Sequence, residues 1–201
     1  MTIEEYFSIE LDTDYRNEYY AGKLVELDGD SREHASLTVN LIGQVGQQTR
    51  RTDNHTFAGG LRIRCDAQNY LYADLTVVCG KSQIEKIDEM ESLLNPGVIF
   101  EILSEKTEQR DRGVKWHIYQ QIKSLQHYVL ISRWDPYVEI YTRKDNGDWL
   151  LHIETDPAGS FAIPAIDVTI GMADLYEGVP IELQPTGSLD GPSPEEEISE
   201  K

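Results

Sequence analysis

The sequence lacks the features that mark several protein classes. It has only two cysteines, Cys65 and Cys79, too few for a disulfide framework, so a reduced, cytoplasmic environment is the default expectation. No apolar run approaches the roughly 20 residues of a membrane-spanning helix, and the acidic opening MTIEEYFSIE is unlike a secretory signal. The phosphate-binding patterns GxxxxGK(S/T) and GxGxxG are also missing. These absences argue against membrane proteins, disulfide-stapled domains and nucleotide-binding loops.

Basic residues are scarce as well. The chain has 18 lysines and arginines against 36 acids, a formal charge of −18, of which residues 186–201 carry −4 and residues 1–185 carry −14. A body of this charge repels nucleic acid at long range. A polyanionic substrate would therefore need a local basic patch or a divalent metal ion.

The length of 201 residues suits one domain. We expect it to span residues 1–185, with a disordered acidic tail over 186–201 that is rich in Pro, Gly, Ser and Glu. Helical spacing is found at 2–10, 31–50 and 107–122. Strand patterns are found at 17–30, 55–66, 70–80, 97–103, 127–132, 137–143 and 148–154, and 81–96 reads as a loop or marginal helix. This order predicts an α+β or mixed α/β domain around one central sheet.

Two acids interrupt apolar strands. Asp74 lies in YLYADLTVVC and Glu101 in GVIFEIL. A buried carboxylate needs a partner, and two carboxylates on neighbouring strands repel each other unless a cation or proton lies between them. Mg²⁺ takes oxygen ligands and accepts few carboxylates plus waters. Structural ion pairs or strand-end positions would also explain the two acids, and that alternative stays open.

The helix expected at 107–122 has polar residues beside its apolar stripe. At about 100° per residue, Val114, Ile118 and Ile122 form the stripe, and Asp111 and Lys115 lie on or next to it. A surface pair at i and i+4 would account for them. The functional interpretation is that Lys115 points into a site beside Glu101.

Basic residues gather at the start of this helix. Lys106, Arg110 and Arg112 lie there in an otherwise acidic chain. We interpret Arg110 and Arg112 as candidate contacts for substrate phosphate, while a solvated helix start explains the same charges less specifically.

The segments YADLTVVC, NPGVIFEILSEKTEQRDRGVKWHIYQQIKSLQHYVLIS and VEIYTR resemble the Uma-type putative restriction endonuclease family of the PD-(D/E)XK nuclease superfamily, over about residues 3–183. The resemblance implies a restriction-endonuclease-like αβββαβ core with a central mixed sheet and added strands. It also implies that Asp74 and Glu101 bind Mg²⁺, with Mn²⁺ as a substitute. Ala73 replaces the superfamily's proline and Leu103 its lysine, so Lys115 is our candidate for the lysine that orients the attacking water.

Three further residues are accessory candidates. The resemblance places His34 near the metal, although Ser31 is a plausible N-cap and a histidine in that first turn can be structural. Glu26 is a candidate third acid, with an exposed hairpin acid as the alternative. Asp111 is expected to orient Lys115 from one turn earlier.

Two functions remain in competition. The first is a Mg²⁺-dependent endodeoxyribonuclease, a hydrolase that acts as a homodimer because cutting both DNA strands is simplest with two sites. The second is an inactive nuclease-fold module acting in protein interaction or regulation, which the charge and Leu103 favour. We expect Lys115→Ala to abolish any nuclease activity and to leave folding nearly intact.

Overall fold

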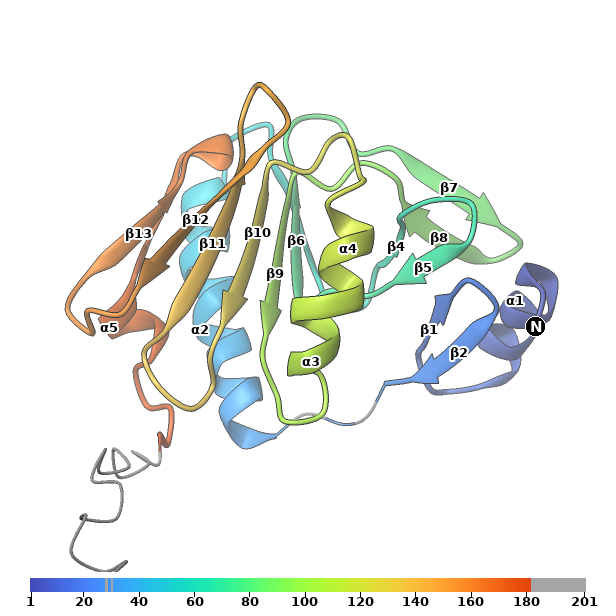
Figure 1. Cartoon of the computed structure of the whole chain (residues 1–201), viewed down its shortest axis with the longest axis horizontal. Helices are drawn as coiled ribbons and strands as arrows, with labels where there is room; N and C mark the ends of the chain where they lie inside the picture. Colours follow the sequence, from blue (N-terminus) through green and yellow to red (C-terminus); the bar gives the residue numbers. More distant parts are fainter. Residues whose placement is uncertain (28, 30, 182–201) are drawn as a thin grey trace, which may run out of the picture.

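The computed structural model describes residues 1–27, 29 and 31–181 (Figure 1). Its strands form two six-stranded sheets and one hairpin. The first sheet has the order β2 (Lys23–Glu26), β1 (Asn17–Tyr20), β5 (Asn69–Leu71), β4 (Arg62–Arg64), β8 (Met90–Leu93), β7 (Ile84–Ile87). The central sheet has the order β12 (Trp149–Glu154), β11 (Val138–Arg143), β10 (His127–Ile131), β9 (Val98–Ile102), β6 (Leu75–Val78), β3 (His55–Ala58). The hairpin pairs β13 (Ser160–Ile163) with β14 (Val168–Gly171).

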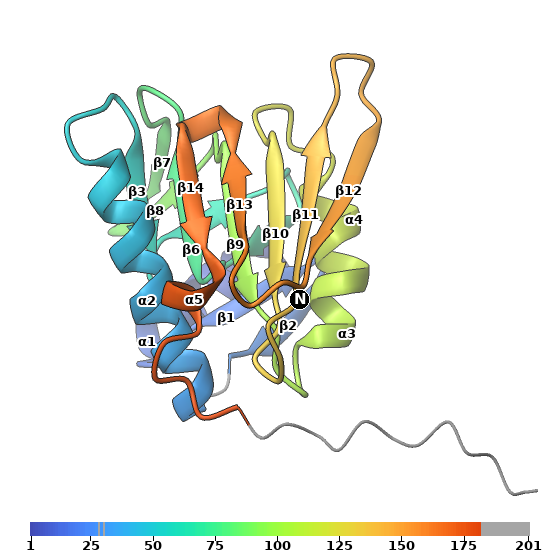
Figure 2. The ribbon, with the colours of Figure 1, turned by 90° about the vertical axis from the view of Figure 1, so that its left-hand side faces the viewer.

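Helices lie on both faces of the central sheet, and the N-terminal helix packs on the first sheet. They are α1 (Ile3–Asp12), α2 (Arg32–Thr49), α3 (Glu108–Arg110), a π-helical turn (Asp111–Lys115), α4 (Trp116–Tyr119), a 3₁₀ turn (Pro164–Ile166) and α5 (Met172–Leu175). The long helix α2 and the β13–β14 hairpin cover one face, and the continuous helix from α3 to α4 covers the other (Figure 2). No helix in the described part of the chain is long and apolar enough to cross a membrane.

The central sheet contains the predicted αβββαβ order. Along the chain, α2 is followed by β3, β6 and β9, then by the α3–α4 helix and β10. The pairs β3–β6 and β6–β9 are antiparallel, whereas β9–β10 is parallel, as expected for two strands joined by a helical crossover. Strands β4 and β5 are inserted between β3 and β6, and β7 and β8 between β6 and β9. The predicted mixed α+β fold class is therefore confirmed, with the first sheet built largely from insertions.

Strand β9 is buried on both faces. Its side chains alternate between the two cores: Val98, Phe100 and Ile102 pack in the α2 cluster, and Ile99 packs in the cluster under the α3–α4 helix. Glu101 has the parity of Ile99, so its carboxylate faces the α3–α4 helix.

The prediction for residues 81–96 was wrong. Instead of a loop or marginal helix, β7 and β8 form a hairpin in which Ile87 pairs with Met90. Asp88 has a positive φ of 52° in its turn, a conformation that Asp adopts more readily than most residues. Strand β8 also pairs in parallel with β4. The local sequence has only a weak preference for strand, and the pairing with β4 outweighs it. Such long-range pairing cannot be predicted from a short polar segment.

The apolar stripe of the 107–122 helix was predicted partly wrongly. Ile118 and Ile122 are buried, but Val114 is 45% exposed. The chain forms a π turn over Asp111–Lys115, which holds more residues per turn than an α-helix. Lys115 and Asp111 therefore continue the buried face in place of Val114. The predicted domain boundary at 185 and the acidic tail 186–201 lie outside the described residues.

The first prediction concerns His127, a buried residue of β10 whose Nδ1 lies 3.1 Å from Thr142 Oγ1. Burial lowers the pKa of His127 to about 4. Above pH ~6.5 the imidazole is neutral in both states, and between pH ~6.5 and ~4 only the unfolded chain takes up the proton. Stability should thus fall by on the order of 1–3 kcal/mol across this window.

His127→Gln should remove that part of the pH dependence, measured as the free energy of urea unfolding at several pH values. His55→Gln, at an exposed position in β3, is the control and should keep it. Equal pH dependence in His127→Gln and the parent protein would contradict the prediction.

Candidate active site

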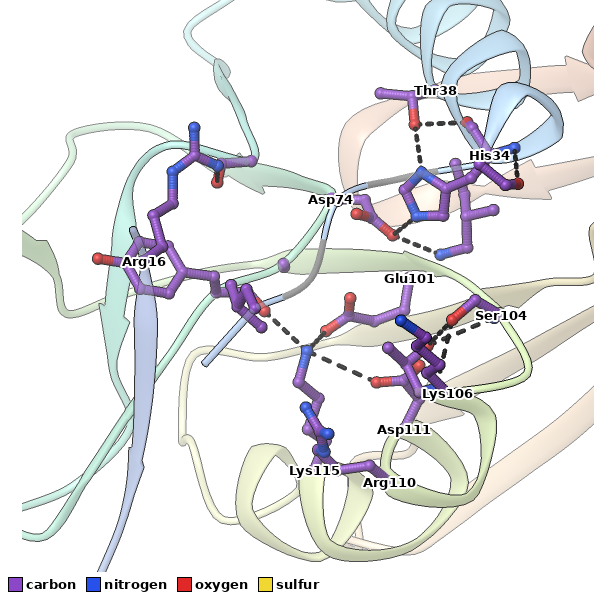
Figure 3. A pocket seen from close by; sticks show the side chains of 18 of the residues that line it. Arg16, His34, Thr38, Asp74, Glu101, Ser104, Lys106, Arg110, Asp111 and Lys115 are labelled. Carbon is purple, nitrogen blue, oxygen red and sulfur yellow. Dashed lines mark hydrogen bonds and ion pairs between the residues drawn. The ribbon is translucent and has the colours of Figure 1, made fainter. Parts of the chain in front are cut away.

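A cavity of about 610 Å³ opens where the start of α2, the start of β6, the end of β9 and the α3–α4 helix meet (Figure 3). Its lining includes His34, Asp74, Glu101, Asp111 and Lys115. With Glu26 and Arg110, which also line it, seven of the eight candidate site residues share one pocket, and only Arg112 is missing from it.

Asp74 immediately precedes β6, and backbone pairing fixes its place. Because Leu75 pairs with Phe100 in the antiparallel β6–β9 ladder, Asp74 lies opposite Glu101. Its Oδ2 accepts a hydrogen bond from the Ile102 N–H at 2.6 Å and lies 3.2 Å from His34 Nε2. His34 reaches it from the first turn of α2, which Ser31 caps as predicted.

Glu101 is only 4% exposed, in the middle of the central sheet. Its Oε1 accepts hydrogen bonds from Lys115 Nζ at 2.9 Å and from the Tyr119 hydroxyl at 3.3 Å. Leu103, at the position of the missing lysine, packs in the apolar cluster below the helix. The ammonium beside Glu101 therefore comes from the helix and not from β9.

The Lys115 ammonium is surrounded by oxygen atoms. It lies 2.9 Å from Glu101 Oε1, 3.0 Å from Glu18 Oε1 and 3.5 Å from Asp111 Oδ1, and it donates to the Tyr72 carbonyl at 2.9 Å. The π turn places it there, and such turns recur at functional sites. The contact with Asp111 has the geometry predicted from the i, i+4 spacing.

Three buried carboxyl groups, those of Glu18, Glu101 and Asp111, surround one ammonium group, and this excess of acid affects the pKa values in the site. Burial alone would lower the pKa of Lys115, but the Glu101 and Glu18 carboxylates outweigh it, so the pKa is raised and the ammonium stays charged. Burial raises the pKa of Glu101 well above its usual range, with Lys115 opposing the shift. Burial likewise raises the pKa of Asp111. The site thus holds an excess of acid that a proton or a cation can neutralise.

Glu18 is the site residue that the sequence reasoning missed. It is 0% exposed, and besides Lys115 it binds the Tyr72 N–H at 3.1 Å and the Tyr20 hydroxyl at 2.5 Å. The signal was present, because Glu18 interrupts a strand, β1, just as Asp74 and Glu101 interrupt apolar runs. Glu26, chosen instead, is exposed at the end of β2 and lines the pocket mouth.

The two arginines proposed for phosphate binding have different positions. Arg110 lines the pocket, but its Nη1 lies 3.5 Å from the buried Glu18 carboxylate. Arg112 lies outside the pocket lining and pairs with Glu108 at 2.9 Å and with Glu139. The structure therefore does not bring Arg112 together with the other candidates.

The available oxygen atoms decide which metal ion the site would suit. No group of three or more His, Cys, Asp or Glu side chains among the described residues is arranged to enclose a metal ion. However, each of the two carboxylates uses only one oxygen in these hydrogen bonds. The other oxygens, Asp74 Oδ1 and Glu101 Oε2, accept no hydrogen bond from the residues that the structure describes. The donor set thus fits a hard cation that keeps several waters, as Mg²⁺ does, and not a fully protein-caged ion.

Comparison with known proteins places the chain in a family. Residues 3–169 match the Uma2 family, described as putative restriction endonucleases. The chain belongs to the Uma2 family. Two similar proteins are known from Synechocystis, both described as uncharacterized. The protein slr1290 is 26% identical over 88% of this chain and 91% of its own length. The protein sll1609 is 27% identical over 75% of this chain and 85% of its own length.

A solved structure shares the Uma2 fold. It is a putative nuclease of the DUF820 group from Anabaena variabilis, which superposes with a TM-score of 0.68 over 88% of this chain and 98% of its own. At 18% identity this likeness shows a common fold. The added first sheet, which supplies Glu18 to the site, thus belongs to a domain whose overall architecture recurs.

The second prediction concerns the stability of this Uma2 domain. Lys115→Met should destabilise it by about 3–5 kcal/mol near neutral pH, because it leaves buried carboxylates without their cation. This revises the expectation that removing Lys115 leaves folding nearly intact. The raised pKa values mean that the folded variant binds protons which the unfolded chain releases, so the deficit should shrink as the pH falls.

Urea unfolding of parent and variant from neutral to mildly acidic pH measures this difference. Lys86→Met, at an exposed lysine of β7, is the matched control and should change stability little at any pH. A Lys115→Met deficit that stays constant or grows on acidification would contradict the explanation.

Proposed function

We propose that this Uma2 protein is a metal-dependent nuclease that hydrolyses DNA phosphodiester bonds. The observation that carries the proposal is the pair Asp74 and Glu101, set opposite each other on adjacent strands at one pocket, with Lys115 Nζ 2.9 Å from Glu101. Family membership supports a nuclease, while the metal and the DNA substrate are our inference.

The metal site would use the second oxygens of Asp74 and Glu101. Mg²⁺, or Mn²⁺ in its place, would supply Lewis acidity, a more acidic bound water and charge neutralisation at the phosphate. The protein's own part is orientation: the Ile102 N–H and His34 fix the Asp74 carboxylate. On its other side, His34 Nδ1 lies 3.4 Å from the Thr38 hydroxyl.

Lys115 would act as a fixed positive charge at the edge of the reaction site. Its ammonium is held by four oxygen atoms of Glu101, Glu18, Asp111 and Tyr72, so it needs no reorganisation when negative charge develops. This arrangement supports the lysine role predicted for Lys115, and Asp111 and Glu18 would set its position.

The alternative function, an inactive nuclease-fold module acting in protein interaction or regulation, is favoured by the charge of −18. The homodimer and the cytoplasmic location stay predictions. The homodimer was predicted because cutting both strands of a duplex is simplest with two active sites. Sedimentation of the purified protein would test it.

The third prediction tests metal binding and cleavage together. Mg²⁺ or Mn²⁺ should raise the melting temperature of the parent protein, since a ligand at a hundred times its Kd stabilises by about 2.7 kcal/mol. The same ions should support cleavage of DNA. Asp74→Asn and Glu101→Gln should lose both responses, because each removes a carboxylate that would hold the ion.

Glu89→Gln is the control for this experiment. It removes a carboxylate from an exposed turn whose partner is Lys86, and should keep both responses. A parent protein that neither melts higher with metal nor cleaves DNA would favour the interaction module instead.

The fourth prediction distinguishes a fixed point charge from charge alone. Lys115→Arg keeps the positive charge but should reduce cleavage as severely as Lys115→Met, because a planar guanidinium cannot occupy the position of a compact ammonium among these oxygens. Cleavage rates would be compared at the temperature where both variants are folded. An active Lys115→Arg variant would mean that the geometry around Nζ is unimportant.

A further inference from the structure

The proposed nuclease site needs groups that receive substrate phosphate, and the two predicted arginines are engaged elsewhere. Arg110 faces the fully buried Glu18 carboxylate, and Arg112 pairs with Glu108 and Glu139 outside the pocket lining. Both guanidinium groups are therefore directed at carboxylates of the protein. Apart from Lys115, the other cations of the lining are Arg16, Lys106 and Arg133, and the contacts of the two arginines fix their places at the pocket.

Arg16 is the first of these. It precedes β1, is exposed and lines the pocket, and its Nη1 donates to the Gly59 carbonyl at 2.6 Å. The Gly59 N–H in turn donates to the Asp74 carbonyl at 2.9 Å. The guanidinium is thus held beside the Asp74 segment, on the side of the pocket away from the α3–α4 helix (Figure 3). Among the described residues it has no carboxylate within ion-pair distance.

Arg133 is the second, just beyond β10. Its guanidinium lies 5.1 Å from the centre of the Trp134 ring. Its Nη2 lies 3.4 Å from Glu105 Oε1, and the Glu105 side chain is 79% exposed. The Arg133 side chain is only 15% exposed, but its partner carboxylate is on the surface, so a phosphate can replace Glu105 without leaving a buried acid unpaired. Arg133 also lines the pocket.

The two arginines lie at opposite ends of the carboxylate pair. Arg16 is tied to the Asp74 backbone through Gly59, whereas Arg133 contacts Glu105, which follows Glu101 past the end of β9. A polynucleotide backbone that touched both would pass over Asp74 and Glu101. This is the path that cleavage between the two contacts requires.

The acids of the same lining limit how many phosphates can be bound. Asp14, Glu26 and Glu105 line the pocket at exposed positions, and the chain as a whole carries −18. Proteins that hold a duplex commonly neutralise about 6–10 phosphates. Further phosphates next to this pocket would meet carboxylates instead. Glu101 is also buried, so the strand must bend into a recess, which is harder for stiff duplex DNA.

We propose that the substrate of this site is single-stranded DNA, gripped at two phosphates by Arg16 and Arg133. The inference rests on the proposed nuclease function and names its substrate class. It makes sequence readout a minor factor, because contacts to phosphate carry no base information.

The fifth prediction tests this with fluorescence anisotropy on the full chain, using labelled single-stranded and duplex oligonucleotides of equal length at one fixed Ca²⁺ concentration. The single strand should bind more tightly. Its log Kd should change with log salt with a slope of about 1.4 in magnitude, the value for two phosphates. Arg16→Gln and Arg133→Gln should each weaken binding regardless of base sequence and reduce the slope by about 0.7.

Two controls separate local from global charge. Lys86→Gln removes one positive charge from β7, outside the pocket lining, and Arg112→Gln removes the arginine that the structure places away from the site. Both should leave the slope unchanged. Tighter duplex binding, a slope of about 5 or more as for six duplex contacts, or slopes unaffected by the Arg16 and Arg133 changes would overturn the inference.

The outcomes also separate this inference from the nuclease proposal. Cleavage of duplex DNA with metal, together with tight duplex binding, would leave the nuclease function standing and refute the single-strand substrate. Two-phosphate binding of single strands without cleavage under Mg²⁺ or Mn²⁺ would refute the nuclease function and leave a binding site for single-stranded DNA. Binding of neither oligonucleotide would refute the substrate proposal.

Discussion

The site depends on one buried ammonium. Lys115 Nζ contacts acids from three separate segments, Glu18 of β1, Glu101 of β9 and Asp111 of its own helix. Buried charges are tolerated only when partners compensate them, so the position of β1 and the π turn must both satisfy this single group. The first sheet, the central sheet and the α3–α4 helix therefore share one electrostatic requirement, and moving any of them leaves a charge uncompensated.

The first sheet thus takes part in the site. The αβββαβ core alone brings together Asp74, Glu101 and Lys115, but Glu18 comes from β1, in the sheet built largely from insertions. Tyr72 links that sheet to the core. Its N–H donates to Glu18, its carbonyl accepts from Lys115, and two residues later the chain reaches Asp74.

The sequence predicted those parts of the site that follow from local rules. Asp74 and Glu101 were identifiable because a carboxylate inside an apolar strand needs a partner. Periodicity predicted a mixed α/β domain, and the family resemblance implied the αβββαβ order. Val114 was misplaced because a count of 100° per residue cannot anticipate a π turn. Glu18 is likewise a carboxylate within a strand that needs a partner, but that partner, Lys115, lies far along the chain. Arg110 was credited with free charge for the same reason, since only the tertiary fold brings it to Glu18.

The charge balance of the pocket also orders the events of the proposed reaction. Six acids and five basic residues line the described part of the cavity, and Glu18 adds a buried acid that faces Lys115 and Arg110. An anionic strand approaching this excess of carboxylate is repelled. A divalent cation held by Asp74 and Glu101 would offset this excess negative charge, compete with the proton that burial favours on Glu101, and remove the repulsion of phosphate. In the proposed reaction, metal uptake would therefore precede substrate binding, because the bound ion offsets the charge that repels a polyanion.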